Sequence, residues 1–173
     1  MKYFLSIDQG TTSTRSILFN NDGSIASSHQ IELTQYFPDN NSVEHDPVEI
    51  IDSVNKCIQN VVNDIDVKEI VSIGISNQRE TTVAWSKSTG KPFYNAIVWQ
   101  DTRTQIICDE LLKNKRFTEL IKKTGLPIST YFSLSKILWF IENVSEIRSS
   151  LEDDVCFGTI DSWIVYNLSL IHI

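Results

Sequence analysis

Short apolar runs separated by polar turns predict a sheet-rich start of the chain. The runs at residues 3–7, 16–20 and 24–30 contain β-branched and aromatic residues and have the length of β-strands. Asn21-Asp22-Gly23, between the second and third runs, is a strong hairpin signal. We therefore expect a three-stranded antiparallel meander.

A helical spacing of apolar residues follows the meander. After a polar loop at residues 32–42, Asp46 is a natural N-cap, Pro47 takes the first helical position and Glu49 has the capping-box spacing. The expected apolar stripe contains Ile51, Val54, Ile58, Val61 and Ile65. A β-branched run at residues 70–75 comes next, which predicts a β-α-β crossover and a strand parallel to an earlier one.

A hairpin and a further helix are expected in the middle of the chain. Residues 82–85 and 94–99 are strand-like, and a turn around Gly90 joins them. The polar residues after this hairpin predict a helix start, with Asp101 or Thr102 as the N-cap. The expected apolar face of this helix contains Ile106, Ile107 and Leu111.

More helices and one strand are expected towards the end of the chain. A short helix at residues 117–123 ends at Gly125, and a strand at residues 155–160 precedes a helix capped by Asp161. The helix between them has an apolar stripe of Leu134, Ile137, Leu138 and Ile141. Parallel and antiparallel pairing together indicate an α/β chain with a mixed sheet.

Composition and charge narrow the class of protein. The 173 residues are 41% apolar and 21% charged, which is ordinary for one well-cored domain. The net charge of -7 argues against nucleic-acid partners, and no apolar run reaches membrane-spanning length, so no membrane insertion is expected. The three cysteines lack metal-ligand spacing, which favours buried thiols in a reducing compartment. We expect a cytoplasmic protein.

The stretch from Asp8 to Arg15 has the composition of a phosphate-binding loop. Gly10 and the hydroxyl residues Thr11, Thr12, Ser13 and Thr14 offer convergent donors, and Arg15 adds a delocalised cation. Asp8, at the end of a strand, can hold Mg²⁺ through water. The alternative is a Thr-rich β-turn with an ordinary aspartate. The loop lies between two strands and has no Walker sequence.

A second polar group follows the expected parallel strand. Ligands of open α/β sheets collect beyond the carboxyl ends of strands, and Arg79 and Glu80 lie there. Their fork-shaped donors and acceptors match adjacent hydroxyls of a polyol, although an exposed Arg-Glu pair is the alternative. Trp99 and Tyr131 can contact such a ligand or pack in the core. His45 directly precedes a helix cap, where a structural role is expected.

The first motif resembles a known ATPase fold. D-Q-G-T-T-S-T-R after an N-terminal strand is similar to the first phosphate motif of the actin, hexokinase and Hsp70 ATPases, in the form used by the FGGY carbohydrate kinases. The resemblance implies an actin-like (ribonuclease H-like) fold with ATP and Mg²⁺ as cofactors. It implies further that the metal lies near Asp8, and that the phosphates are bound by Gly10, Thr11, Thr12, Ser13 and Arg15.

Three later segments resemble the glycerol kinase branch of that family. They are S-N-Q-R-E-T-T with N-A-I-V-W-Q-D-T-R, then T-G-L-P-I-S-T-Y-F-S, then F-G-T-I-D-S-W. The resemblance implies an ATP:glycerol 3-phosphotransferase that makes glycerol 3-phosphate. It also implies that glycerol is bound by Arg79, Glu80, Trp99 and Tyr131. Full-length members of the family are often homo-oligomers.

The resemblance covers residues 1–168, and the tail at residues 169–173 matches nothing expected of the family. Family members continue for several hundred residues, so residues 1–168 are expected to be an incomplete first domain. Their general base, an aspartate in a later segment, would have no counterpart here, so no catalytic residue is assigned and little turnover is expected. Another FGGY sugar kinase and a non-catalytic glycerol- or nucleotide-binding fragment stay open as alternatives.

Overall fold

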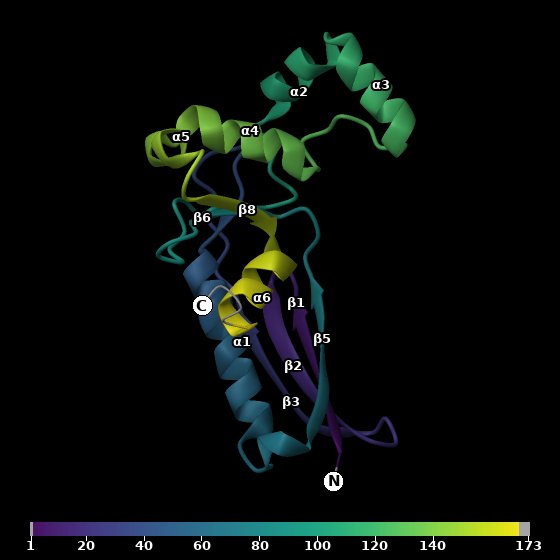
Figure 1. Ribbon diagram of the computed structural model, residues 1–173. Coiled ribbons are helices and arrows are strands. Elements are labelled where there is room, and N and C mark those ends of the chain that lie inside the picture. The colour runs from purple at the N-terminus through teal and green to yellow at the C-terminus, as the bar shows by residue number, and fades with distance from the viewer. Residues whose placement is uncertain (1, 170–173) are drawn as a thin grey trace. The chain divides into compact units, whose positions relative to one another are not determined.

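The computed structural model describes residues 2–169 and contains two compact units (Figure 1). The first unit is made of residues 2–35, 45–78 and 160–169 within these bounds, and the second of residues 36–44 and 79–159. Each unit is described below by itself. No helix among the described residues is long and apolar enough to cross a membrane.

The first unit contains a four-stranded mixed sheet. Its strands are β1 (Tyr3–Gln9), β2 (Ser13–Asn20), β3 (Ile25–Glu32) and β5 (Ile70–Asn77), in the spatial order β3-β2-β1-β5. β1, β2 and β3 pair antiparallel, and β5 pairs parallel to β1. The predicted meander and the predicted parallel crossover are both confirmed.

Helix α1 (Pro47–Val62) covers this sheet. The Asp46 carboxylate accepts a hydrogen bond from the N–H of Val48 at 2.8 Å, which confirms the predicted cap. The capping box is wrong, because Glu49 Oε1 accepts from the N–H of Thr34 at 2.9 Å. The predicted apolar stripe is only partly correct. Val54 and Val61 are buried as expected, but Ile51 and Ile58 are only half-buried, and their neighbours Ile50 and Cys57 are buried instead.

Two further elements complete the first unit, namely the short 3₁₀ helix η1 (Val67–Glu69) and helix α6 (Ile160–Ser169). The indole Nε1 of Trp163 on α6 donates to the carbonyl of Pro47 at 2.9 Å, which ties α6 to the start of α1. α6 begins at Ile160, so the prediction that Asp161 caps it is wrong. Asp161 lies in the first turn instead, where a carboxylate favours the helix dipole.

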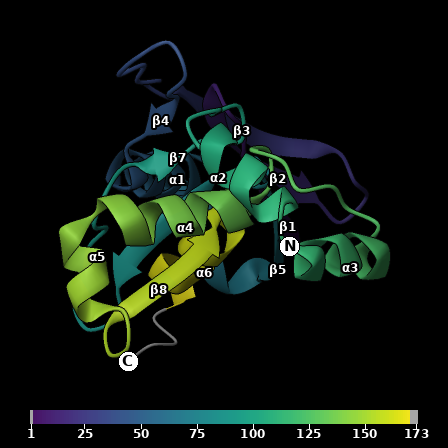
Figure 2. The same cartoon turned by 90° about the horizontal axis from the view of Figure 1, so that it is seen from above.

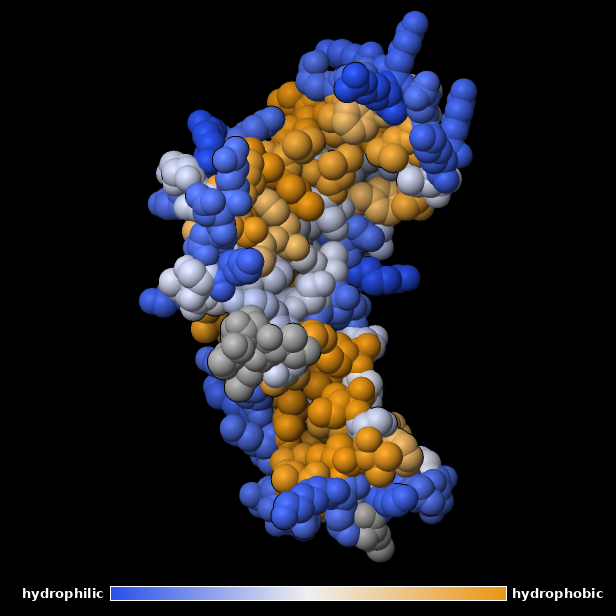
Figure 3. All heavy atoms as spheres, viewed as in Figure 1, coloured by the Kyte–Doolittle hydropathy of each residue, from blue (hydrophilic) through white to orange (hydrophobic). Residues whose placement is uncertain are grey.

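β5 carries an exposed apolar surface at the edge of this sheet. Val71 and Ile73 on β5 are 54% and 56% exposed. Ile75 on β5 and Phe4 on the neighbouring β1 are also exposed. Figure 3 shows a continuous apolar area over this part of the unit. β5 is bonded to β1 on one side, and no other described strand pairs with it.

The second unit is built on a smaller sheet. The strand order is β4-β7-β6-β8, with bounds β4 (Glu44–His45), β7 (Ala96–Ile97), β6 (Thr82–Ser86) and β8 (Val155–Thr159), and of β4 only Glu44 belongs to this unit. The antiparallel pairing of β6 with β7 confirms the expected hairpin in shortened form. Its helices are α2 (Gln105–Leu112), α3 (Lys115–Thr124), α4 (Ser133–Asn143) and α5 (Ser145–Ser150). α4 lies against β6, and Figure 2 shows α4 continuing into α5.

Several expectations for these helices are wrong. α2 begins after Thr104 rather than at Asp101 or Thr102, and Ile106 is 75% exposed. On α4, Leu134 is exposed, and the buried residues are Ser135, Lys136 and Phe140. Phe140 joins a core cluster with Ala84, Ile97, Val144 and Ile147. Helix α5 was not foreseen.

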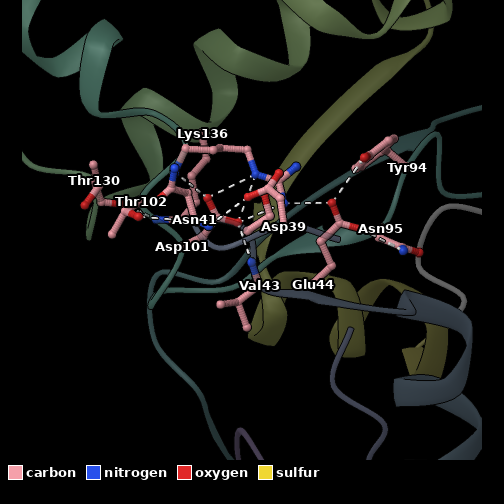
Figure 4. Close-up of polar contacts among 12 residues, drawn as sticks. Asp39, Asn41, Val43, Glu44, Tyr94, Asn95, Asp101, Thr102, Thr130 and Lys136 are labelled. Carbon is pink, nitrogen blue, oxygen red and sulfur yellow. Dashed lines mark hydrogen bonds and ion pairs between the residues drawn. The ribbon is translucent and has the colours of Figure 1, made fainter. Parts of the chain in front are cut away.

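An ion-pair network crosses the second unit (Figure 4). The Arg103 guanidinium lies 2.7 Å from a carboxylate oxygen of Glu44 and 2.8 Å from one of Asp101. Glu44 also accepts hydrogen bonds from Tyr94 and Asn95, and Asp101 accepts one from the N–H of Val43. This network joins β4 to the segment after β7 and explains why Asp101 does not cap a helix.

Candidate functional site

The predicted phosphate loop is the turn of the β1–β2 hairpin. The N–H of Gly10 donates to the carbonyl of Ser13 at 2.8 Å and closes the turn. Thr12 is exposed at its tip, and the Ser13 hydroxyl accepts from Gln30 Nε2 at 3.0 Å. A Cβ at position 10 would lie 3.2 Å from the Ser13 carbonyl oxygen, so the tightness of the turn favours glycine.

Thr14 departs from the expectation that all four hydroxyls of this loop offer convergent donors. Its side chain is fully buried, and its hydroxyl shares a 2.7 Å hydrogen bond with that of Ser53 on α1. Successive residues of a strand point to opposite faces, and β2 already begins at Ser13. Thr14 therefore fastens the hairpin to the helix.

Asp8 and Arg15 are directly opposed on β1 and β2. Directly opposed residues place their side chains on the same face of a sheet, and both are exposed. Arg15 places an exposed guanidinium there, and Asp8 an exposed carboxylate. No group of three or more His, Cys, Asp or Glu that could hold a metal occurs among the described residues. One carboxylate with phosphate oxygens and water is a donor set that fits Mg²⁺.

Buried glutamine side chains hydrogen-bond to the backbone of this loop. Gln9 Nε2 donates to the Gly10 carbonyl at 2.7 Å, and Gln78 Nε2 lies 3.1 Å from Gln9 Oε1 and 3.3 Å from the same carbonyl. Gln78 Nε2 is also 3.1 Å from Nδ1 of His45. These residues are at most 6% exposed. They hold the loop by hydrogen bonds that the sequence pattern did not reveal.

His45 is structural in this arrangement, as expected. Burial lowers the pKa of its imidazole from 6.5 to about 4, against a smaller opposite effect of the Glu49 carboxylate. The ring is therefore neutral at neutral pH. A neutral Nδ1 can accept from the Gln78 amide, which leaves the proton on Nε2, and Nε2 has no hydrogen-bond partner among the described residues.

Glu80 has an unusual backbone and a fixed carboxylate. Its backbone φ is 65°, and it is the one non-glycine residue with a positive φ in the described part of the chain. Such a conformation is uncommon outside glycine and is often found at functional sites. Glu80 Oε2 accepts hydrogen bonds from the N–H and the hydroxyl of Ser133, at 3.1 and 2.9 Å. The carboxylate thus caps α4, whose own N-cap residue, Phe132, offers no side-chain acceptor.

Trp99 and Tyr131 meet beside Glu80. Their ring centroids are 5.9 Å apart at 69°, an edge-to-face contact. The N–H of Trp99 donates to the hydroxyl of Thr81, next to Glu80, at 3.2 Å. Tyr131 precedes Ser133 by two residues, and its ring also contacts Phe132 at 5.1 Å. Both rings are only half-buried, so they can contact a ligand as well as each other.

A cavity of about 300 Å³ adjoins this group. Glu80 and Ser133 lie on its mostly apolar wall, which helices α2, α3 and α4 form together with the loop between α3 and α4. The lining residues are Glu80, Leu111, Leu120, Thr124, Leu126, Pro127, Ile128, Ser129, Phe132, Ser133, Leu134 and Ser135. An apolar area over the same helices is visible in Figure 3.

Three of the four predicted polyol residues are thus brought together in the second unit. Arg79 is exposed and makes no hydrogen bond or ion pair with the residues that the structure describes. The predicted phosphate residues belong to the first unit. Ser133, Gln9, Gln78 and Lys136 were missed. No sequence signal pointed to Lys136, because it lies outside the expected apolar stripe of this helix.

Comparison with known families identifies the class. Residues 3–172 match the model of the FGGY family of carbohydrate kinases, N-terminal domain. The chain belongs to this family. Its fold is accordingly the actin- and hexokinase-like fold, which confirms the expected α/β architecture with a mixed sheet and flanking helices.

The relatives that the chain resembles include two bacterial glycerol kinases. The chain is 51% identical over 172 residues to a glycerol kinase of Borrelia garinii subsp. bavariensis, and the match covers 98% of this chain and 34% of that protein. It is 53% identical to a glycerol kinase of Bacillus cereus strain G9842, covering 97% and 34%. The chain therefore spans about a third of the length of these relatives.

Solved structures give the same picture. The glycerol kinase of Plasmodium falciparum with ADP aligns with a TM-score of 0.87 at 37% identity, covering 98% of this chain and 35% of that one. A xylulose kinase from Lactobacillus acidophilus aligns with a TM-score of 0.84 at 24% identity, covering 97% and 33%. The second likeness concerns the fold alone.

Proposed function

We propose that this protein contributes the glycerol-binding face and the first phosphate loop of an ATP-dependent glycerol kinase. The contact of Trp99 with Tyr131, beside the anchored carboxylate of Glu80, carries the proposal. The relatives with about half of their aligned residues identical are glycerol kinases, which supports glycerol over other carbohydrates as the acceptor.

Glycerol is small, and each of its hydroxyls both donates and accepts hydrogen bonds. Ser133 binds Oε2 of Glu80, which leaves Oε1 as an acceptor for a glycerol hydroxyl. The exposed Arg79 guanidinium is a fork-shaped donor for adjacent hydroxyl oxygens. The rings of Trp99 and Tyr131 cover the carbon skeleton. Oriented binding of this kind lowers the entropy cost of in-line attack.

The hairpin turn is proposed to hold the phosphates. Gly10, Thr11, Thr12 and Ser13 supply a compact loop without bulky side chains, and Arg15 binds phosphate oxygens. Asp8 would hold Mg²⁺ through water. ATP, when bound, supplies the phosphoryl group, and Mg²⁺ offsets its charge. We place the protein in the cytoplasm, where ATP is available.

Phosphoryl transfer to a hydroxyl also needs a carboxylate that accepts the hydroxyl proton. In the proposed kinase this aspartate lies outside the third of the relatives that the chain matches. The residues named above bind and orient, and none of them is assigned as the general base. We therefore expect the 173-residue chain alone to bind its ligands but to turn over very slowly.

A chimera tests the proposal. Residues 1–169 of this chain replace the matching third of the Bacillus cereus glycerol kinase, and ATP-dependent phosphorylation is measured with glycerol, xylulose and gluconate. We expect glycerol to have the highest kcat/KM, and Arg79→Leu to reduce that value by about 10–100-fold, as for a lost hydrogen bond to a charged group. A chimera that prefers xylulose or gluconate would overturn the proposal in favour of another sugar kinase.

A further inference from the structure

Lys136, on the first turn of α4, is fully buried. Its ammonium donates to three consecutive carbonyl oxygens, those of Thr130 at 2.6 Å, Tyr131 at 2.9 Å and Phe132 at 3.4 Å. An ammonium has three N–H donors and no acceptor, so the three carbonyls match its hydrogen-bonding capacity. Figure 4 shows Lys136 beside Thr130 and Asp101.

The location of Lys136 is electrostatically unfavourable without such partners. A buried cation costs free energy unless it is paired or hydrogen-bonded, and the positive end of the helix dipole disfavours a cation on the first turn. The carboxylates of Asp101 and Glu80 and the thiol of Cys108 are the titratable groups that act on it. The hydrogen bonds to the three loop carbonyls offset the cost of burying Lys136.

The three carbonyls also determine the shape of the loop. Successive carbonyls of an extended strand point in alternate directions, whereas these three converge on one nitrogen atom. Residues 130–132 must therefore curve around the ammonium. The middle residue of this curve is Tyr131, whose ring contacts Trp99.

We propose that Lys136 is a positioning residue of the glycerol site, because its ammonium holds residues 130–132 in the curve that places Tyr131 beside Trp99. This inference rests on the proposed function. The first turn of α4 then fixes two glycerol contacts at once. Ser133 orients the Glu80 carboxylate through its N–H and hydroxyl, and Lys136 orients Tyr131 through the backbone.

The order of the loop is measured first, on the 173-residue chain. Amide hydrogen exchange of a peptide covering residues 128–133 is compared for wild type, Lys136→Met and the matched control Lys122→Met, which removes an exposed lysine of α3. We expect exchange at least tenfold faster in Lys136→Met and unchanged exchange in the control. Equal protection in Lys136→Met and wild type would overturn the inference, whether or not glycerol is the substrate.

Kinetics of the chimera test the link to the site. Lys136→Met should raise KM for glycerol about tenfold and leave KM for ATP within twofold, because the effect passes through Tyr131. In a Tyr131→Ala background, Lys136→Met should add no further increase in KM for glycerol. Independent, multiplicative effects of the two substitutions would overturn the inference. Wild-type chimera without glycerol activity would instead overturn the proposed function.

A conservative variant covers the case in which Lys136→Met does not fold. Lys136→Arg keeps the charge, but a planar guanidinium cannot direct its donors at three carbonyls that converge on one point. We expect a several-fold higher KM for glycerol and faster exchange of residues 128–133 than in wild type. Wild-type values for both in Lys136→Arg would count against the positioning role.

Discussion

The carboxylate of Glu80 caps helix α4 by accepting hydrogen bonds from both the N–H and the hydroxyl of Ser133, which lies 53 residues further along the chain. One carboxylate thus has a structural partner on Oε2, and its Oε1 has no hydrogen-bond partner within the described part of the chain. Its backbone, at a φ of 65°, is held in a conformation that most residues avoid.

Two substitutions of Glu80 separate these contributions. Glu80→Ala removes the cap and should lower the free energy of unfolding by about 1–2 kcal/mol. Glu80→Gly removes the same cap but relieves the left-handed backbone, so it should be about 1 kcal/mol more stable than Glu80→Ala. Urea denaturation of the three proteins measures both differences. Equal stability of the Ala and Gly variants would show that the backbone at position 80 is not strained.

Gly10→Ala should disturb the phosphate loop. The new Cβ would lie 3.2 Å from the carbonyl oxygen of Ser13, which accepts the hydrogen bond of residue 10, so the turn must open slightly. We expect a loss of about 1 kcal/mol in stability and a higher KM for ATP in the chimera. Gly74→Ala is the matched control, because a Cβ there has open space and no positive φ. Similar effects of both substitutions would contradict the role of the tight turn.

His45 should make the protein acid-sensitive. Its pKa is lowered from 6.5 to about 4 by burial, so between these values the unfolded chain binds a proton that the folded chain does not. The contribution of neutral His45 to the free energy of unfolding is therefore fully present above about pH 6.5. It is lost as the pH falls towards 4, and this loss is at most about 3 kcal/mol. Urea denaturation at pH 7, 5.5 and 4.5 should show a steeper loss in wild type than in His45→Gln.

The control for this prediction is His29→Gln on β3, which should keep the wild-type pH dependence. His29 is not fully buried, and no hydrogen bond of its side chain is found within the described part of the chain. If the pH dependence of His45→Gln equalled that of wild type, the acid sensitivity would arise from other groups.

Arg103→Met should be strongly destabilising. It leaves the carboxylates of Glu44 and Asp101 buried without their cation, and breaking a buried pair in this way costs about 3–5 kcal/mol. Lys113→Met, which breaks an exposed pair with Glu110, should change stability by less than about 1 kcal/mol. Thermal unfolding of both variants is the measurement. A change of similar size in both would mean that solvent reaches the Arg103 network.

The sequence predicted the positions of helices and strands better than it predicted which face of each helix is buried. The β1–β2 hairpin, the cap at Asp46 and the parallel β5 follow from local turn and capping chemistry, which acts within a few residues. The buried face of α4 did not follow, because Ser135 shares a hydrogen bond with Thr104, 31 residues earlier, and Lys136 is satisfied by the backbone carbonyls of the preceding loop. Hydrophobic periodicity treats a lysine as exposed, whereas three backbone carbonyls can make it a core residue.

The candidate site was predicted in a similar way. Asp8 and Arg15 were identified from their residue types around a turn, and their opposition across two strands follows from the register of the hairpin. The supporting amides of Gln9 and Gln78 could not be found in this way. They contact each other only after β1 and β5 pair, and glutamine carries no pattern that distinguishes a buried side chain from an exposed one.

The edge strand β5 is held more firmly at its carboxyl end than at its amino end. Its side chains at Val71 and Ile73 are exposed, so burial contributes little to holding the strand. Beyond its carboxyl end, Gln78 binds Gln9 through both backbone and side chain. Local opening should therefore begin at the Ile70 end and proceed towards Gln78. The first unit can fray along this edge while the end that carries the phosphate loop keeps its hydrogen bonds longest.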